Sequence, residues 1–582
     1  MKPAFVTDHL DTWTSAIEKK SASGRGSNKK INLYGIKKLR ELILELAVRG
    51  KLVPQDPNDE PASMLLEKIV AEKEILIKEK KIKKPKKLPE IIKEEWLFDL
   101  PKGWKWVRLN ELGEWGAGAT PKRGNPEFYG GNIPWFKSGE LNADYISNSE
   151  ETITELALKQ SSLRYNKTGD VLLAMYGATI GKTSILKIPA TTNQAVCACT
   201  PFNGFKNIFL LTLLKAYNRR FTGMGAGGAQ PNISKEKIIA TIIALPPTNE
   251  QHRIVAKVDE LMSLCDLLEQ QTEDSIAAHQ TLVETLLGTL TNSQNAEELT
   301  QNWNRISDHF DTLFTTEHSI DQLKQSILQL AVMGKLVPQN PNDEPASVLL
   351  EKIVVEKSQL IKEGKIKKQK PLSEISEDEK PFDLPDGWEW CRGEHVADFI
   401  DPQPSHRTPP VFDNGVAYVG YTDIDLVNGI DFKGARKVSP QVFKEHQDRY
   451  LLKSGDFVFG KIGTLGKPFF LPKPFDYCLS ANLILIQPNL LAIHPRYLAY
   501  YLDSPIFLEI LGSKKTNSTH GVFGIKKARV LVIPFPPIDE QHLIVSKVDQ
   551  LFALCERIIN HVTNTQYTRL HLTDAIVDQA VG

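Results

Sequence analysis

Two segments of the chain place apolar residues at the spacing of a helix that packs against another helix. The apolar positions follow one another at steps of four and three residues, and mainly polar residues lie between them. The seam consists of Ile254, Val258, Leu261, Cys265 and Leu268 in the first segment and of Ile544, Val548, Leu551, Cys555 and Ile558 in the second. Such a heptad-like seam predicts two long amphipathic helices, each with a partner helix.

The seam of the first segment changes character further along the chain. It becomes polar at Thr272, Ser275 and His279 and apolar again at Leu282 and Leu286. Polar seam positions can fix the register of paired helices at a cost in stability. A break or bend in the helix explains the pattern equally well, so both interpretations stay open.

Shorter amphipathic helices precede a motif, GKLVPQ, that occurs twice. Their apolar positions are Ile36, Leu39, Ile43 and Leu46 before the first motif and Ile320, Leu323, Ile327 and Leu330 before the second. Gly50 and Gly334 are placed to end these helices. A further helix is expected over residues 65–80 and 349–362, with a lysine-rich tail over 78–87 and 362–370. We interpret the tail first as a solvated linker and second as a phosphate contact.

The chain repeats part of its own sequence. Residues 50–73 and 334–357 differ at three of twenty-four positions, and residues 246–252 resemble 536–542. The segments between these repeated parts barely resemble one another. A constant frame therefore holds two variable inserts, which suits a protein that presents two different reading surfaces.

The repeat continues across the termini. Residues 7–12 match 307–312, so the end and the start of the chain together resemble the middle connector, residues 250–339. This is a circular pseudo-twofold, in which one connector is continuous and the other is assembled from both ends. The connectors can then lie antiparallel, with the inserts at opposite ends of a helical rod.

Each insert has the size of one domain, about 150 residues. Both contain strand-like runs punctuated by Gly, Pro and Asn, and one helix-like run, at residues 207–217 or 495–502. We predict an α+β fold in which two mixed α/β domains are joined by long antiparallel coiled-coil-like helices. The expected parts are an N-terminal helical region with linker at 1–102, a first insert domain at 103–249, a central helical region with linker at 250–385, a second insert domain at 386–538 and a C-terminal helix at 539–582.

Composition indicates a globular protein of the cytoplasm. The 582 residues are 41% hydrophobic and 24% charged, and the formal net charge is zero. No apolar run reaches the roughly 18 residues of a membrane span, and the N-terminus lacks the apolar core of a secretory signal. Six cysteines without a C-x-x-C pair argue against a disulfide framework. The pair Cys197 and Cys199 is expected to consist of two core-facing strand thiols rather than zinc ligands.

The zero net charge hides a local imbalance. Residues 105–244 hold 16 Lys/Arg and 10 Asp/Glu, a balance of +6, and residues 389–535 hold 17 and 14, a balance of +3. Both inserts are mildly basic, which permits contact with nucleic acid without requiring it.

Motifs for catalysis are weak. The run GATIGKT at residues 177–183 resembles a phosphate loop but is one residue short of the required spacing. Neither G-x-S-x-G nor H-E-x-x-H occurs, and the N/D-P-P-Y/F motif of amino-methyltransferases is also absent. A non-catalytic reader is therefore the preferred hypothesis, and a stand-alone DNA-acting or NTP-using enzyme on a duplicated scaffold is the alternative.

Exposed basic and polar loops are the candidate DNA contacts, because Arg and Lys suit guanine edges whereas Asn and Gln suit adenine. An ordinary surface loop is the plain alternative for each residue taken singly. The candidates are Lys122, Arg123, Tyr176, Lys182, Arg219, Arg220 and Gln230 in the first insert, and Ser405, His406, Arg407, Lys461, Lys467, Lys514, Lys515, Asn517 and His520 in the second.

The combined pattern resembles the specificity subunit of type I restriction-modification systems. The resemblance is carried by Thr120-Pro121, by IPWFKSGEL at residues 133–141, by Gly181-Lys182 and by the closing motif at residues 246–261. The second insert keeps Gly466-Lys467 and the closing motif at 536–551, but it departs from the pattern at its front.

The resemblance implies that each insert is a target recognition domain for one half of a bipartite, asymmetric DNA site. It also implies that the helical regions dock two methyltransferase subunits, with two motor-nuclease (helicase-nuclease) subunits added for restriction. Adenine methylation with S-adenosylmethionine, and translocation and cleavage with ATP and Mg²⁺, would belong to those partners. No cofactor, metal or catalytic residue is expected in this chain.

Overall fold

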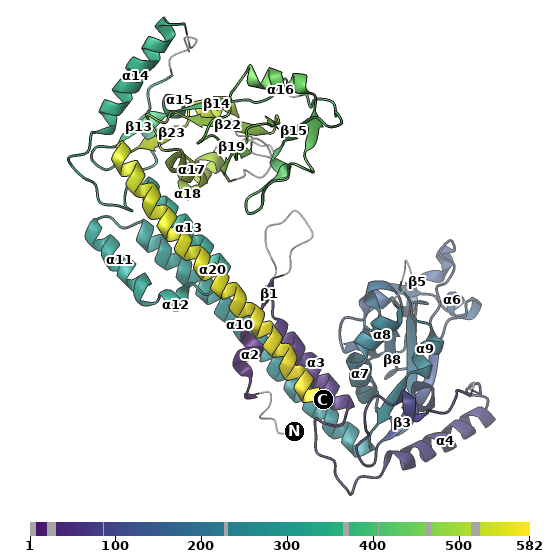
Figure 1. Ribbon diagram of the computed structural model, residues 1–582. Helices are drawn as coiled ribbons and strands as arrows, with labels where there is room; N and C mark the ends of the chain where they lie inside the picture. The colour runs from purple at the N-terminus through teal and green to yellow at the C-terminus, as the bar shows by residue number, and fades with distance from the viewer. Residues whose placement is uncertain are drawn as a thin grey trace. The chain divides into compact units, whose positions relative to one another are not determined.

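The computed structural model describes residues 7–19, 31–84, 87–225, 231–364, 372–405, 407–460, 467–513 and 524–581. The chain divides into unit 1, which is Met1–Ser275 with Thr565–Gly582, and unit 2, which is Ile276–Asn564. Each unit holds one mixed α/β domain and one group of packed helices (Figure 1). The fold class is mixed α and β, as predicted.

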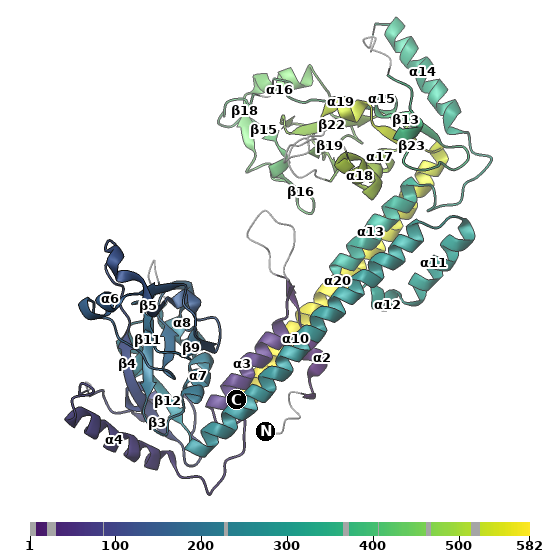
Figure 2. The same cartoon turned by 180° about the vertical axis from the view of Figure 1, so that it is seen from behind.

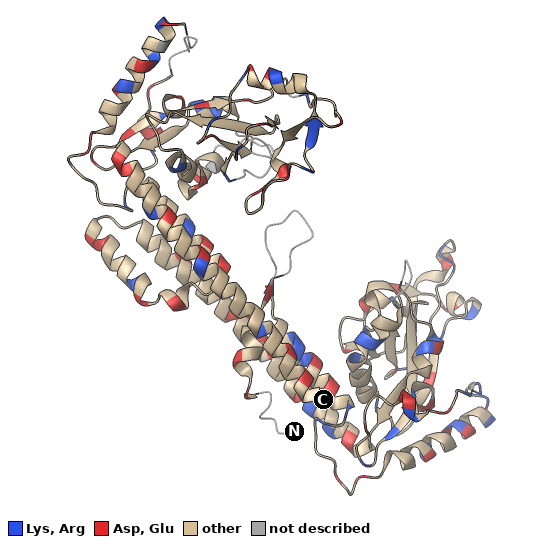
Figure 3. Ribbon diagram, in the orientation of Figure 1, with Lys and Arg blue, Asp and Glu red and all other residues tan. Residues whose placement is uncertain are grey.

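The two predicted long helices are α10 (Thr248–Thr291) and α20 (Ile538–Val581), each of 44 residues. Of the predicted seam, Leu268, Leu551 and Ile558 are half-buried and the other members are buried. Acidic and basic residues share the outward surface of these helices (Figure 3).

The predicted continuation of the seam at Leu282 is wrong. Leu282 is 50% exposed, whereas Val283 and Leu287 are buried at 1% and 5%. The helix is not broken in the polar stretch. A straight helix has 3.6 residues per turn, so Val283 lies five turns beyond Cys265, and a strict heptad count drifts away from the buried face.

In unit 1 the first GKLVPQ helix, α3 (Tyr34–Val48), packs against parts of both long helices. Its Arg40 binds Asp266 at 2.7 Å and Glu269 at 2.6 Å, while its Tyr34 hydroxyl donates to Asp574 at 2.8 Å. Further along the chain Lys51 donates to the backbone oxygen of Val581 at 2.8 Å, so α3 runs parallel to the end of α20. The other elements of this helical part are α2 (Leu10–Ser15), β1 (Glu18–Lys19), β2 (Ile31–Asn32), α4 (Ala62–Lys78) and η1 (Lys93–Glu95).

Unit 2 repeats this packing with the long helices exchanged. Here α13 (Glu317–Val332) pairs with the beginning of α20 through Lys324 and Glu556 and with the end of α10 through Gln322 and Glu284 at 3.0 Å. The remaining elements are α11 (Ala296–Asp308), α12 (Phe310–Leu313), α14 (Ala346–Lys362) and η5 (Glu377–Glu379). The internal likeness of the sequence therefore corresponds to the same helix packing within each unit.

The mixed domain of unit 1 contains a five-stranded sheet in the order β4-β11-β8-β9-β6 and a three-stranded sheet in the order β10-β5-β7 (Figure 2). A separate ribbon pairs β3 with β12 where the domain begins and ends. The strands are β3 (Lys105–Arg108), β4 (Gly113–Ala117), β5 (Tyr129–Phe136), β6 (Tyr145–Ile146), β7 (Glu151–Ile153), β8 (Val171–Ala174), β9 (Thr183–Leu186), β10 (Thr191–Thr192), β11 (Val196–Pro201) and β12 (Ile242–Leu245). The α-helices and 3-10 helices are α5 (Leu109–Leu112), η2 (Pro126–Phe128), η3 (Ser138–Glu140), α6 (Glu155–Gln160), η4 (Gly177–Thr179), α7 (Asn207–Ala216), α8 (Asn218–Gly225) and α9 (Lys235–Ala240).

The mixed domain of unit 2 follows a similar plan, with four strands instead of five in its larger sheet and a separate ribbon of β16 and β17. Its sheets have the orders β14-β22-β19-β20 and β18-β15-β21, and β13 pairs with β23 as the closing ribbon. The strands are β13 (Glu389–Arg392), β14 (Ala397–Ile400), β15 (Val416–Val419), β16 (Ile424–Asp425), β17 (Gly429–Ile430), β18 (Arg436–Val438), β19 (Phe457–Gly460), β20 (Phe469–Phe470), β21 (Cys478–Leu479), β22 (Leu483–Pro488) and β23 (Val532–Phe535). The α-helices and 3-10 helices are α15 (Gly393–Val396), η6 (Tyr421–Asp423), α16 (Pro440–Gln447), α17 (Pro495–Asp503), α18 (Pro505–Ser513) and α19 (Ile525–Arg529).

The glycine that ends each GKLVPQ helix is packed against the start of a mixed domain. Gly334 has a φ of +69°, and a Cβ added there would lie 2.4 Å from Cγ of Pro385 and 3.0 Å from Cζ2 of Trp388. Gly50 has the same relation to Pro101 and Trp104. Only glycine satisfies both the left-handed backbone and the close approach.

Gly334→Ala is expected to destabilise unit 2 by more than the backbone strain alone. The positive φ costs about 1–2 kcal/mol, and the overlap with the two rings adds about 1–3 kcal/mol. Gly364→Ala is the matched control, because Gly364 has a φ of +70° but no neighbour within 4 Å in the described part of the chain. Thermal unfolding of both variants measures the difference, and equal losses would contradict a role for the contact.

Candidate nucleic-acid interface

Loops from distant parts of the first mixed domain gather at one end of its large sheet. β4 and β8 end there, and β11 and β9 begin there, because β11 is antiparallel to both β4 and β8, and β9 is antiparallel to β8. Residues 118–125, 137–142, 176–182 and 193–195 therefore lie at the same end. Loops carried by the ends of a rigid sheet are a common place for recognition residues.

Two amide side chains accompany the candidate residues at this end. Lys182 donates from Nζ to Oδ1 of Asn142 at 2.6 Å, and the hydroxyl of Thr120 donates to Oε1 of Gln194. A neutral amide leaves the positive charge of Lys182 available to a phosphate or a base. Lys122 is exposed, and Tyr176 is 42% exposed. The topology thus brings Lys122, Tyr176 and Lys182 to one end of the sheet.

Arg123 is held by partners within the domain. It lies 4.9 Å from the ring centroids of Tyr129 and Trp135 and pairs with Glu151 at 2.6 Å. Glu151 also pairs with Lys137 at 2.7 Å, and hydrogen bonds from Arg123 and Lys137 lower the pKa of Glu151 to about 2. The guanidinium therefore has a structural contact that competes with any contact to DNA.

Arg219 and Arg220 lie in a helix and not in the predicted loop, although Arg219 is exposed as predicted. Both are in helix α8, where Arg219 pairs with Glu41 of α3 and Arg220 lies 5.6 Å from the ring of Tyr217. Arg219 can reach Glu41 because α8 follows directly after α7, which packs on α3. Gln230 lies outside the described residues.

In the second mixed domain the described candidates are Ser405, Arg407 and Lys467. Ser405 and Arg407 are exposed in the loop after β14, and Lys467 lies 3.5 Å from Asp503. Gln403 donates to the hydroxyl of Ser405 at 3.0 Å and to the backbone oxygen of Arg407 at 3.3 Å. His406, Lys461, Lys514, Lys515, Asn517 and His520 lie outside the described residues.

Residues 177–183 resemble a phosphate loop in sequence, but their backbone does not have the geometry of one. The N–H groups of Gly177, Ile180, Gly181 and Lys182 all donate to backbone oxygens of the same domain. A phosphate loop needs successive N–H groups free to surround a phosphate. This segment is a tight turn between β8 and β9.

Cys197 and Cys199 are core residues of β11. Both are fully buried on one face of the strand, and burial raises the pKa of Cys197 to about 12. A thiol that stays protonated is a poor metal ligand. No cluster of three or more His, Cys, Asp or Glu suited to a metal occurs among the described residues.

Three segments that recur in the sequence, residues 50–55, 98–104 and 246–252 in the first half and 334–339, 382–388 and 536–542 in the second, meet in a buried contact that sequence reasoning did not identify. Glu250, from the motif after β12, accepts from Nε1 of Trp104 at 2.9 Å and from Nε2 of Gln55 at 3.1 Å. Its neighbour Gln251 donates to the backbone oxygen of Pro246 at 3.1 Å. Burial raises the pKa of Glu250, although the hydrogen bonds from Trp104 and Gln55 oppose this effect. The same set recurs as Glu540, Trp388, Gln339, Gln541 and Pro536.

The contact joins segments that recur in both halves of the chain. It fastens the GKLVPQ segment, the first strand of a mixed domain and the start of a long helix to one another. The signal in the sequence was that all three motifs recur together, but no rule of local spacing joins residues so far apart. Asn142, Gln194 and Gln403 were also missed, although each lies beside a predicted loop.

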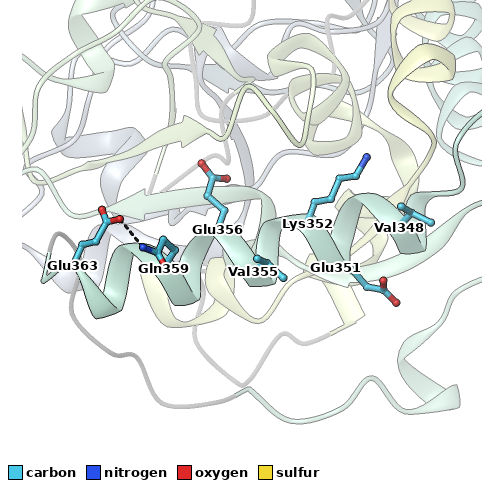
Figure 4. A pocket seen from close by; sticks show the side chains of 7 residues that line it. All are labelled: Val348, Glu351, Lys352, Val355, Glu356, Gln359 and Glu363. Atoms are coloured by element: carbon cyan, nitrogen blue, oxygen red, sulfur yellow. Dashed lines mark hydrogen bonds between the residues drawn. The ribbon is translucent and has the colours of Figure 1, made fainter.

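A hollow on the surface of α14 offers little to a ligand. It is lined by Val348, Glu351, Lys352, Val355, Glu356 and Gln359 of this helix and by Glu363 directly after it (Figure 4). A single helix face encloses nothing, and its Gln359 is already bonded to Glu363 at 2.8 Å. Among the described residues, no helix is long and apolar enough to cross a membrane.

Comparison with known proteins identifies the family. The sequence model described as the type I restriction modification DNA specificity domain matches residues 101–278 and 420–565. The EcoAI and EcoEI specificity subunits of type I restriction enzymes, both from Escherichia coli, are each 40% identical to this chain over 594 and 598 residues, covering 99% of this chain and 99% of each relative. A solved structure concerned with complex assembly and conformational transition of the type I restriction-modification system aligns with a TM-score of 0.48 and 19% identity, covering 83% of this chain and 99% of that chain. The chain therefore belongs to the family of type I restriction-modification specificity subunits, which are non-catalytic subunits for DNA recognition.

Proposed function

We propose that this chain reads an asymmetric, bipartite DNA target, with one mixed domain for each half-site. The observation that carries the proposal is that two domains with similar strand plans present different side chains at matching places. The turns η3 and η6 occupy equivalent places in the two domains. Asn142 lies two residues after η3, and Asp425 lies two residues after η6. The strands β11 and β22 are likewise equivalent. Gln194 lies two residues before β11, and Ala481 lies two residues before β22. Asn and Gln can read adenine in the major groove, and Asp can accept only from a donor such as cytosine N4.

Contacts to phosphates would add affinity without sequence information. The local excess of positive charge in both inserts supports such contacts, and Lys122, Lys182 and Arg407 are the described candidates for them. Arg123, Arg219 and Lys467 have carboxylate partners within the protein, and we propose a smaller contribution from them.

We further propose that the chain scaffolds two methyltransferase subunits, and two motor-nuclease subunits when it takes part in restriction. The near-identity of residues 50–73 and 334–357 supports two copies of one partner, because a repeated surface binds the same partner twice. S-adenosylmethionine, ATP and Mg²⁺ would be bound by these partners. Six unpaired, buried cysteines support the cytoplasm as the compartment.

The test is the composition and DNA binding of the purified assembly. The full-length chain is tagged, isolated with its copurifying subunits and weighed intact by native mass spectrometry. We expect two copies of a methyltransferase subunit for each copy of this chain, and enrichment of one two-part motif from random double-stranded DNA. A lone chain with no sequence preference would contradict the proposal.

A further inference from the structure

A buried histidine in the second mixed domain is hydrogen-bonded towards one of the candidate loops. His446 lies in α16 with 2% of its surface exposed. Its Nδ1 is 2.7 Å from the hydroxyl of Tyr450, and its Nε2 is 2.9 Å from Oε1 of Gln403. The hydroxyl of Tyr450, which is also buried, accepts the backbone N–H of Leu479 at 3.2 Å. These side chains connect the strand β21 in the interior to the loop after β14.

The partners fix which nitrogen of His446 carries the proton. Oε1 of Gln403 can only accept, so Nε2 of His446 donates to it. Nδ1 then accepts the hydroxyl hydrogen of Tyr450, whose oxygen is occupied by the N–H of Leu479. Burial lowers the pKa of His446 to about 4. At neutral pH the ring is therefore uncharged and held in a single tautomer.

Gln403 connects the hydrogen-bonded side chains of Tyr450 and His446 to the loop after β14. Its Nε2 donates both hydrogens, to Oγ of Ser405 at 3.0 Å and to the backbone oxygen of Arg407 at 3.3 Å. Oγ of Ser405 also accepts the backbone N–H of Arg407 at 3.4 Å. Because the Ser405 oxygen already accepts two hydrogen bonds, its own hydrogen remains available to donate. The guanidinium of Arg407 has donors only.

We propose that Tyr450, His446 and Gln403 form a positioning relay, which presents Ser405 and Arg407 as hydrogen-bond donors to the acceptor edge of a base pair. Guanine, with acceptors at N7 and O6, is the base that fits this set best. The inference rests on the proposed function, because it assigns the second mixed domain to one half-site. A buried polar network costs desolvation that apolar packing avoids, but when fully satisfied it specifies one arrangement of the groups at its end.

The relay belongs to one domain. The corresponding helix of the first mixed domain, α6, has the sequence ELALKQ and contains no histidine. Loss of the relay is therefore expected to affect one half-site and to leave the other unchanged. A purely structural role would instead lower stability, or affinity for all DNA, without a change of base preference.

Two variants interrupt the relay at different points. His446→Phe keeps an aromatic ring of similar size but removes both hydrogen bonds, and Gln403→Met removes only the connection to the loop. His446→Gln keeps one donor and one acceptor and is the conservative variant. Gln441→Met is the matched control, because Gln441 is exposed on α16 and bonds only to Glu445 in the described structure, at 3.3 Å.

Each full-length variant, with its copurifying subunits, is offered random double-stranded DNA, and the bound sequences are determined. We expect His446→Phe and Gln403→Met to reduce the preference for guanine at one or two positions of a single half-site by about 5- to 150-fold. His446→Gln should recover part of that preference, and Gln441→Met should match the wild type.

An unchanged motif in both interrupting variants would overturn the relay. So would a uniform loss of affinity with the base preference intact, because that result indicates a phosphate contact or a folding defect. If the wild-type assembly itself enriches no motif, the proposed function has failed and the relay fails with it. The result for the wild-type assembly thus distinguishes failure of the relay from failure of the proposed function.

Discussion

Replacing residues 105–244 with the corresponding insert of another family member is expected to change one half of the DNA target completely and to leave the other half unchanged. The segment begins at β3 and ends just before Leu245, the last residue of β12, so it starts and finishes within one antiparallel ribbon. Trp104 and Glu250, which fasten the domain to the helical frame, both stay in place. Sequencing of the sites that the hybrid assembly binds or methylates measures the outcome.

The matched control for this exchange is a hybrid in which residues 105–244 are replaced by the insert of a relative that reads the same first half-site. Its target should not change. Each wrong base pair in a recognition site costs about 1–3 kcal/mol, so a half-site of several base pairs should be lost entirely by the first hybrid. A change in both half-sites would contradict independent reading by the two domains.

Periodic features of the fold were predictable from the sequence because they depend on neighbours along one helix. The seam of α10 and α20 and the glycines that end α3 and α13 are of this kind. The prediction failed at Leu282, where a heptad count and a helical turn of 3.6 residues diverge. Sheet order was not predictable, because the parallel pairing of Trp135 with Thr191 joins residues with no local relation.

The candidate site was only partly predictable for the same physical reason. Lysine and arginine in turns were visible, but their partners within the protein were not. Glu151 is 28 residues from Arg123, and Glu41 is 178 residues from Arg219. An arginine already paired with a carboxylate and one that is free to meet DNA look alike in a sequence. Gln403 was missed because the histidine that makes it informative lies 43 residues away.

Arg392→Met is expected to lower the stability of unit 2 by about 1–3 kcal/mol, since it leaves the half-buried carboxylate of Glu379 and two backbone oxygens without their donor. Arg392 is 2% exposed and holds Glu379 with two hydrogen bonds, at 2.7 Å and 2.8 Å. It also donates to the backbone oxygens of Glu374 at 3.0 Å and Val530 at 2.9 Å, so it ties the linker to the closing ribbon. Thermal unfolding at neutral pH measures the loss.

Lys380→Met is the matched control, because Lys380 pairs with the exposed carboxylate of Glu377 at 2.6 Å, and an exposed pair contributes about 0–1 kcal/mol. The double variant Arg392→Met, Glu379→Leu should recover part of the loss, because it leaves no unpaired charge. A loss as small as that of the control would contradict the prediction, because it would show that neither the ion pair nor the backbone hydrogen bonds of Arg392 stabilise unit 2.

The pH dependence of this variant has a definite sign. Hydrogen bonds from Arg392 lower the pKa of Glu379 to about 2, compared with an ordinary value of 4.5. The stabilisation from this carboxylate is therefore fully present above about pH 4.5 and is lost as the pH falls towards 2. Without Arg392 the pKa of Glu379 returns towards its ordinary value, so the gap in thermal midpoint between the wild type and Arg392→Met should narrow as the pH falls below 4.5. A gap that stays constant between pH 7 and pH 3.5 would show that the ion pair contributes nothing beyond the packing of the arginine side chain.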